Sequence, residues 1–462
     1  MREIKNRKSS NHWQSSLGFI AAAAGSAVGL GNIWKFPYIA GENGGGTFVL
    51  FYLLCITILG IPIMIAEVML GRTTQSSPFR AFQRLSQSNS GWQYVGLLGI
   101  FAGVLILSYY SIVAGWGLHY LFLSLFGGFP QDNNPQAYTD LFDSLVQSVR
   151  LNIWWHSVFM ALTTCIVLQG IRGGIERFAN WGMLALFGLL GVLAIYASTL
   201  PGFLPAVQFL FAFNHNFTWT SALEALGHAF FSLSLGIGVM ITYGSYLQIH
   251  DDIVGTSMAI AIADTIVAIG ACLIMFPIAF SVGLEPTAGP GLIFINIPIA
   301  LLQLPLGRIG LIVFFGLLLL AALTSAISLL EMAVAFLIDS CGWTRKIATA
   351  TMAGLIYLLG IPAALSGGEG FFGTKLEQMI GMTWFDAADY LVSNWLLTLG
   401  SIGISLFIGW QLDSQQRLNQ FKDNSRLGSR SWLYTFWFLI IRWFAPFFIV
   451  LIMLYNLGVL SN

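Results

Sequence analysis

An apolar segment long enough to cross a membrane, residues 17–40, carries three glycines in its middle. Its sequence is LGFIAAAAGSAVGLGNIWKFPYIA, in which Gly25, Gly29 and Gly31 disfavour a continuous helix. Inside a membrane, free backbone N–H and C=O groups are tolerated only where they line a cavity or meet a ligand. We therefore expect a broken helix whose carbonyls suit cations and whose N–H groups suit a carboxylate. The alternative is a glycine-rich packing face between helices.

The composition of the 462-residue chain is typical of an integral membrane protein. Hydrophobic residues make up 56% and charged residues 9%, and the mean hydropathy is +0.78. The 15 Trp and 37 Phe residues fit a lipid-facing surface with aromatic belts. A net charge of zero argues against a nucleic-acid partner, and the four scattered cysteines predict neither a disulfide framework nor a zinc site.

Eleven apolar spans are long enough to cross a bilayer, which predicts an all-α integral membrane fold. The third and eighth spans are long, so we expect them to be tilted or to project beyond the membrane. The spans are residues 17–40, 47–71, 92–126, 152–171, 175–200, 219–248, 253–283, 305–340, 345–364, 389–411 and 432–457.

Lys and Arg residues are distributed unequally between the two sides of these spans. If the N-terminus is cytoplasmic, the cytoplasmic segments hold fifteen of these residues and the external segments three. This is the positive-inside pattern, so we expect residues 1–16 to be a cytoplasmic segment that is retained rather than cleaved. An odd number of spans then places the C-terminus outside, and the expected location is the cell (inner) membrane.

A second interruption, FFSLSLGIG at residues 230–238, lies in the sixth span, five spans after the first. Two interrupted helices at corresponding positions of two halves mark the binding site of many membrane transporters. We expect a single transmembrane domain over residues 17–457, with inverted repeats at about 17–200 and 219–411 and an accessory helix at about 432–457.

Longer motifs are spread along the chain: GSAVGLGNIWKFPY at 25–38, ENGGG at 42–46, the segment from GIP to Glu67 at 60–67, SYY at 108–110, Trp116, and TSAIS at 324–328. Together they resemble the neurotransmitter:sodium symporter family, over nearly the whole chain from Trp13 to about Pro446. The most similar pattern is that of bacterial eleven-helix members that carry amino acids on the leucine-transporter fold. The resemblance implies a sodium-coupled symporter with two sodium ions and an amino-acid substrate. It implies no obligatory protein partner beyond the lipid bilayer and no enzymatic activity.

Gly29 indicates the substrate class that the resemblance implies. Monoamine carriers of the family have Asp here, whereas Gly29 leaves room for the carboxylate of a zwitterionic amino acid. Ile237 replaces a Phe of the bacterial leucine carrier, which predicts a wide apolar pocket for hydrophobic or aromatic L-amino acids. The alternative for these positions is plain apolar core. The implied substrate-binding residues are Ser26, Ala27, Gly29, Leu30, Gly31, Ile106, Tyr110, Phe231, Ser232, Ser234, Ile237, Ser325 and Leu329.

Two sodium sites follow from the same resemblance, each built from the oxygen ligands that a hard cation requires. The substrate carboxylate would complete the first site and thereby couple ion and substrate. For the two hydroxyls of the second site, the alternative is hydrogen bonding to the preceding helical turn. Site one comprises Ala27, Asn32, Ser232 and Asp264, and site two comprises Gly25, Val28, Ala321, Thr324 and Ser325.

Asp264 stands where chloride-coupled members of the family usually have Asn, and Ala268 follows where they have Ser. A carboxylate beside two entering cations supplies the negative charge that chloride supplies elsewhere, so we expect chloride independence. His228 replaces a Gln near the same site, which leaves proton exchange by Asp264 open. Charged residues within membrane spans are usually functional. The alternative for Asp264 is a carboxylate whose hydrogen bonds are all made by neighbours on its helix, with no ionic role.

Two pairs align with the gates of the family. Lys35 and Asp389 match the outer charged pair, with Lys in place of the usual Arg, so this pair should be looser. Tyr246 and Asp339 match the inner network, whose usual Arg falls on Ser10, with Arg7 or Lys8 as the candidate substitute.

Other functional classes fit less well. A channel would need a pore lined by polar or charged rings, and an enzyme would need a nucleophile and a base; neither pattern is found in the sequence. A proton-coupled amino-acid carrier of the same fold and a non-transporting amino-acid sensor remain as alternatives.

Overall fold

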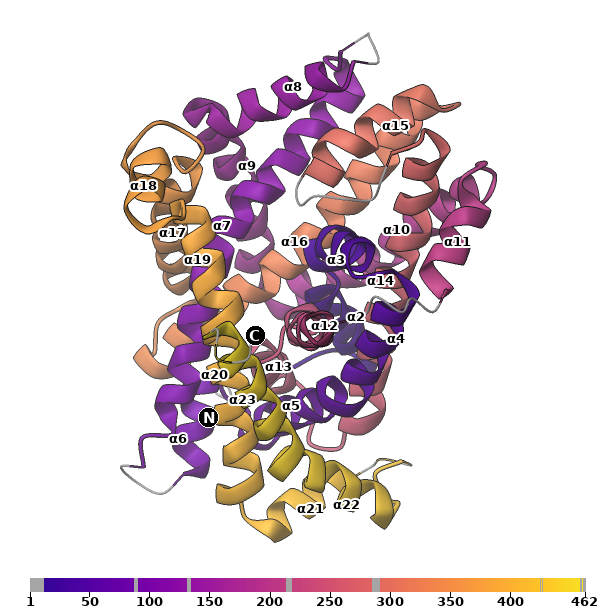
Figure 1. The fold of residues 1–462 in the computed structure, drawn as a ribbon. Coiled ribbons are helices and arrows are strands. Elements are labelled where there is room, and N and C mark those ends of the chain that lie inside the picture. The colour runs from indigo at the N-terminus through magenta and orange to yellow at the C-terminus, as the bar shows by residue number, and fades with distance from the viewer. Residues whose placement is uncertain are drawn as a thin grey trace.

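The structure is a computed structural model that describes residues 12–86, 90–130, 134–212, 218–284, 291–423, 425, 427–457 and 459. All regular structure in these residues is helical, which confirms the predicted all-α fold (Figure 1). Most of the expected N-terminal segment, residues 1–11, lies outside the described residues. Several long helices contain short π-helical turns, which are labelled η.

Nine continuous helices in the described part of the chain are long and apolar enough to cross a membrane. The two longest agree with the long third and eighth spans of the prediction. The nine helices are Gly46–Thr74, Gln93–Phe126, Val149–Leu168, Ile171–Ser198, Ile253–Ser281, Gly307–Cys341, Arg345–Ala364, Trp384–Gln411 and Ser431–Asn456.

Their component elements are α4 (Gly46–Cys55), η2 (Ile56–Gly60) and α5 (Ile61–Thr74); α7 (Gln93–Phe126); α9 (Val149–Leu168); η3 (Ile171–Glu176) and α10 (Arg177–Ser198); α14 (Ile253–Ser281); α16 (Gly307–Cys341); α17 (Arg345–Ala364); α19 (Trp384–Leu391), η6 (Val392–Leu396), α20 (Leu397–Leu406) and η7 (Phe407–Gln411); α22 (Ser431–Leu439), η8 (Ile440–Phe444) and α23 (Ala445–Asn456).

The first expected span is broken, as its glycines predict. Helix α2 (Ser16–Ala27) ends where Val28 becomes extended, with ψ of 99°, and the chain continues as η1 (Gly31–Lys35) and α3 (Phe36–Glu42). The two parts form an angle of 50°. The packing-face alternative therefore fails for this segment.

The sixth expected span is broken more completely. Helix α12 (Trp219–Ser232) and helix α13 (Val239–Gly244) are separated by six non-helical residues, 233–238. Ser234, Gly236 and Gly238 all have positive φ there, with values of 53°, 83° and 88°. Glycine adopts this conformation readily and serine rarely, so the segment needs outside support. Neither half is long enough to cross alone, and the count of eleven spans remains a prediction.

The connections between spans carry short helices in the part of the chain that the structure describes. They are α6 (Pro78–Leu85), α8 (Pro135–Gln147), α11 (Phe203–Phe211), η4 (Leu292–Asn296) with α15 (Ile297–Gln303), η5 (Phe371–Lys375) with α18 (Leu376–Ile380), and α21 (Ser414–Lys422). We call the end with α8 and α15 the upper end and the end with α6 and α21 the lower end (Figure 1).

The broken helices lie in the middle of the bundle. Helix α2 contacts α10, α14 and α16, while α13 packs on α5 and also contacts α2. Figure 1 shows α12 and α2 surrounded by the other helices. Backbone groups freed by the breaks are therefore enclosed by protein, which is the condition for irregular backbone inside a membrane.

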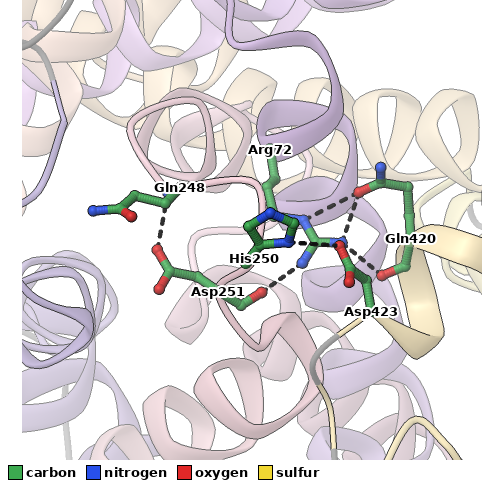
Figure 2. A network of polar contacts seen from close by, with 6 residues as sticks. All are labelled: Arg72, Gln248, His250, Asp251, Gln420 and Asp423. Carbon is green, nitrogen blue, oxygen red and sulfur yellow. Dashed lines mark hydrogen bonds and ion pairs between the residues drawn. The ribbon is translucent and has the colours of Figure 1, made fainter.

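A polar network at the lower end joins three segments that are distant in sequence (Figure 2). Arg72, at the end of α5, is only 1% exposed. Its guanidinium donates to the Asp251 carbonyl, to the Gln420 carbonyl at 2.7 Å and to Gln420 Oε1 at 2.6 Å. His250 Nδ1 lies 3.9 Å from Asp423 Oδ2 beside it. The network fixes α21 and the loop after α13 against α5.

Candidate functional site

A cavity between the two breaks brings the predicted substrate residues together. All thirteen of them line it, from α2, α7, α12, α16 and the two interrupted segments. Two further residues complete the lining: Ser328 on α16 and Leu397 on α20. The cavity volume is about 40 Å³, which is more than one water molecule needs.

Gly29, in the break of the first span, lies close to α7 and α16. A Cβ atom at this position would be 2.7 Å from Ser325 Oγ and 3.3 Å from the Tyr110 hydroxyl. A side chain at this position would therefore displace the Ser325 hydroxyl. The N–H of Leu30 points at the Tyr110 oxygen over 3.4 Å, longer than a usual hydrogen bond, so both groups retain capacity for a ligand carboxylate.

The cluster around Asp264 contains three of the four residues expected for the first sodium site. Asn32 Nδ2 donates to Asp264 Oδ1 at 2.7 Å, and Ser232 Oγ donates to Asp264 Oδ2 at 2.8 Å. Asn32 Oδ1 in turn accepts from the Gly29 N–H at 3.0 Å, which joins this cluster to the cavity. The fourth residue, Ala27, lines the same cavity.

The Asp264 carboxylate is fully buried and has no ion-pair partner among the described residues. A buried carboxylate without a counter-charge is unfavourable, so this oxygen cluster fits a bound cation. Sequence reasoning missed Tyr52, whose hydroxyl donates to Asp264 Oδ2 and to Ser232 Oγ at 3.2 Å each. His228 lies beside Tyr52, with ring centroids 5.7 Å apart, and its two ring nitrogens have no partner among the described residues.

The second expected sodium site lies where α2 ends against α16. Ser325 Oγ is 3.4 Å from the Gly25 carbonyl oxygen and 3.3 Å from that of Val28. Thr324 Oγ1 instead bonds to the preceding turn, at 3.0 Å from the Ala321 carbonyl. Thr324 thus makes the contact that the back-bonding alternative describes, while Ser325 reaches across to the broken helix, and the role of both hydroxyls at a sodium site stays a prediction.

The upper side of the cavity is covered by aromatic rings and a loose ion pair. Tyr110 and Phe231 line both this cavity and a larger one above it, of about 260 Å³. Lys35 Nζ lies 3.9 Å from Asp389 Oδ2, at the limit of an ion pair, and 4.6 Å from the centre of the Phe231 ring. The Tyr109 hydroxyl donates to Asp389 at 3.0 Å and fixes the carboxylate in place.

The lower side is held by polar contacts of Tyr246 and of Asp339, the two residues expected there. The hydroxyl of Tyr246 donates to Glu331 at 2.7 Å rather than to Asp339, and Glu331 forms two 2.7 Å bonds with Arg345. Asp339 accepts from the Ser77 backbone N–H at 2.6 Å. Tyr246 and Asp339 thus have separate partners at the lower end, and Ser10 lies outside the described residues.

The chain start closes this side. Trp13 donates from its backbone to the Tyr246 carbonyl at 3.1 Å and from its indole to the Tyr243 carbonyl at 3.0 Å. Both acceptors belong to or follow α13, the second half of the sixth span. Helix α2 is therefore fixed to α13 beneath the cavity.

Sequence reasoning assigned no role to two buried carboxylates, although one of them, Glu67, ends a motif that carried the family resemblance. Glu67 and Glu331 are charged residues within apolar spans, and both are fully buried. Glu67 Oε1 accepts from the Gly236 N–H at 2.7 Å and so supports the irregular segment of the sixth span. Charge inside a span is the property that could have identified both residues.

The cavity between two broken helices, flanked by oxygen clusters, defines a membrane transporter. The chain belongs to the sodium:neurotransmitter symporter family, whose model matches residues 10–148 and 144–462. YhdH of Bacillus subtilis, described as an uncharacterised sodium-dependent transporter, is 39% identical over 451 residues, 97% of this chain and 98% of the relative. A sodium-dependent transporter of Haemophilus influenzae is 32% identical over 467 residues, 98% of this chain and 99% of its own.

A solved structure agrees with this membership. The crystal structure of MhsT in complex with L-phenylalanine matches with a TM-score of 0.86 and 40% sequence identity, over 96% of this chain and 99% of that one. Together these matches confirm the family resemblance and the transporter fold that the sequence motifs implied.

Proposed function

We propose that the protein is a sodium-coupled symporter that imports hydrophobic or aromatic L-amino acids by alternating access, without chloride. The observation that carries the proposal is the position of Asn32 between the substrate cavity and the oxygen cluster around Asp264. Its side chain accepts from the Gly29 N–H at the cavity and donates to Asp264 in the oxygen cluster. Substrate and cation would thus bind on either side of one residue and raise each other's affinity.

The substrate class is supported by the walls of the cavity. Ile106, Ile237, Leu329 and Leu397 are apolar, and the lining includes no charged side chain. Burial of an acidic or basic side chain there would lack a partner, which excludes charged amino acids. L-phenylalanine in the matching structure of MhsT is a ligand of the same chemistry.

Two sodium ions per cycle are supported by two separate oxygen clusters. The first, around Asp264, adjoins the cavity, and the second joins α2 to α16 through Ser325. A cation at the second cluster would stabilise the arrangement in which these helices are close, and its release would free α2 to move. Asp264 supplies a fixed negative charge beside the first cluster, which supports transport without chloride.

Alternating access requires barriers that open in turn. The upper barrier consists of the rings of Tyr110 and Phe231 and the 3.9 Å pair of Lys35 with Asp389. The lower barrier contains the Arg345 ion pair and the bonds of Trp13. We propose that the two repeats, about 17–200 and 219–411, move relative to each other in the cell (inner) membrane, with the lower end cytoplasmic.

A thermal-shift panel tests substrate and ion together. Purified protein is heated with single amino acids in sodium buffer or in choline buffer at the same ionic strength, because a ligand that binds only the folded state raises Tm. We expect Leu, Met, Phe or Trp to raise Tm in sodium only, and Gly, Glu and Lys to have no effect. Equal stabilisation in choline would favour a proton-coupled carrier and contradict the proposal.

A further inference from the structure

Two serine hydroxyls form a pair on the wall of the substrate cavity. Ser26, in the last turn of α2, and Ser328, on α16, both line it, and their oxygens are 2.6 Å apart. Their side chains are 2% and 1% exposed. Ser328 lies one helical turn from Ser325 and next to Leu329, both of which belong to the side-chain part of the cavity.

The proton of each hydroxyl can be assigned from its partners. Ser328 Oγ is 2.7 Å from the Ser325 carbonyl oxygen, which can only accept, so the Ser328 proton is used there. Either hydroxyl could donate across the 2.6 Å contact, and with the Ser328 proton used on this carbonyl the donor is Ser26. The Tyr243 hydroxyl is a further partner of Ser328. The Ser26 oxygen therefore keeps two lone pairs, for which no donor exists among the described residues.

The neighbouring hydroxyls do not supply this donor. Ser325 Oγ and Ser234 Oγ each point at the carbonyl oxygen of Ser26, at 3.1 Å, and not at its hydroxyl. Ser232 uses its proton on Asp264. The serines in the cavity wall have thus committed their protons to protein acceptors, and the wall at Ser26 offers an acceptor to a ligand.

A buried acceptor without a donor is unfavourable, and a ligand group that donates to it is selected over one that cannot. We propose that the Ser26 hydroxyl, held by Ser328, accepts a hydrogen bond from the substrate side chain. This inference rests on the proposed function and narrows the substrate class. The carrier prefers large aromatic amino acids whose ring bears an N–H or O–H donor, tryptophan and tyrosine, to phenylalanine.

The test compares tryptophan with 3-(3-benzothienyl)alanine, in which sulfur replaces the indole N–H at nearly the same size. Both compete against labelled substrate on purified wild-type protein in sodium buffer, with phenylalanine as a second donorless ligand. We expect tryptophan to bind about tenfold more tightly than the benzothienyl analogue, the value of one well-placed hydrogen bond. In Ser26→Ala this ratio should fall to within twofold.

Ser108→Ala is the matched control, because Ser108 is a buried serine of α7 that bonds to the Leu105 carbonyl and does not line the cavity. It should keep the tenfold ratio. Equal binding of tryptophan and its analogue to the wild type overturns the inference, and this comparison needs no variant to fold. If neither tryptophan nor phenylalanine binds in sodium, the proposed function itself fails, and the two failures are thereby distinguished.

Discussion

Asn32 and Asp264 lie 232 positions apart in the chain, and the amide of the first donates to the carboxylate of the second at 2.7 Å. The contact connects the break in the first span to the middle of α14. It places a carboxyl group in the interior of the bundle, one helical turn before the small side chain of Ala268. Chloride dependence can be tested by changing Asp264 and Ala268.

The first prediction is that sodium-driven uptake is equal in chloride and in gluconate. Asp264→Asn removes the fixed charge, so two cations would enter a low-dielectric site without compensation. We expect uptake by this variant to fall at least tenfold, and Asp264→Asn with Ala268→Ser to regain activity only with chloride. Strong chloride stimulation of the wild type would contradict the assignment.

Thr265→Val is the control for these variants. Thr265 is the next residue of α14, and its hydroxyl only donates to the Ala261 carbonyl at 2.8 Å. This variant should transport as the wild type does in both anions. A loss of uptake here equal to that of Asp264→Asn would show that α14 tolerates no change, and would remove the support for a role of charge.

The second prediction concerns Gly29. Gly29→Ala places a methyl group 2.7 Å from Ser325 Oγ, which bridges α16 to the broken helix. We expect sodium-dependent binding of labelled amino acid to fall by tenfold or more, as measured on purified protein. Gly188→Ala, where a Cβ atom meets nothing within 4 Å, is the control and should leave binding unchanged. Full binding by Gly29→Ala would mean that substrate does not require this close approach.

Much of this site follows from local sequence, and the rest does not. The glycines of the first span predicted its break because their effect on a helix is local, and the motifs placed thirteen residues on one cavity. Ser328 and Leu397 were missed because helix rotation decides whether such residues face a cavity, and the sequence does not encode that rotation locally. Glu331 was missed for a similar reason, since two carboxylates lie on α16 and only their positions in space show that Glu331 is the one 2.7 Å from the Tyr246 hydroxyl.

The third prediction tests the lower barrier. Glu331 is fully buried and its ion-pair partner Arg345 is mostly so, with a side-chain exposure of 22%. Arg345→Gln leaves an uncompensated buried charge and should destabilise the protein by about 3 kcal/mol. Glu331→Gln with Arg345→Gln removes both charges and should recover at least half of the loss in thermal unfolding. Lys346→Gln, at an exposed neighbour, is the control.

That double variant decides whether the pair acts as a unit. If the losses of the two single variants simply add in the double variant, Glu331 and Arg345 are not coupled, and the lower barrier must depend on other contacts.

The fourth prediction concerns ligand size. Ile237 is 3% exposed and lines the cavity, so Ile237→Phe reduces the space for a side chain. We expect competition by Trp and Phe to weaken at least fivefold relative to Leu, and competition by Ala to strengthen. Ile237→Leu, of equal volume, should preserve the wild-type order. If glycine competed best and tryptophan not at all with the wild type, the assignment of the side-chain pocket would be wrong.

Uptake by proteoliposomes tests the central claim most directly. Purified protein is reconstituted, and entry of labelled phenylalanine or tryptophan is followed with external sodium or with choline at constant ionic strength, with no proton gradient. The account predicts accumulation above the external concentration that requires the inward sodium gradient and is abolished in choline. Undiminished uptake in choline, driven instead by an imposed proton gradient, would contradict it.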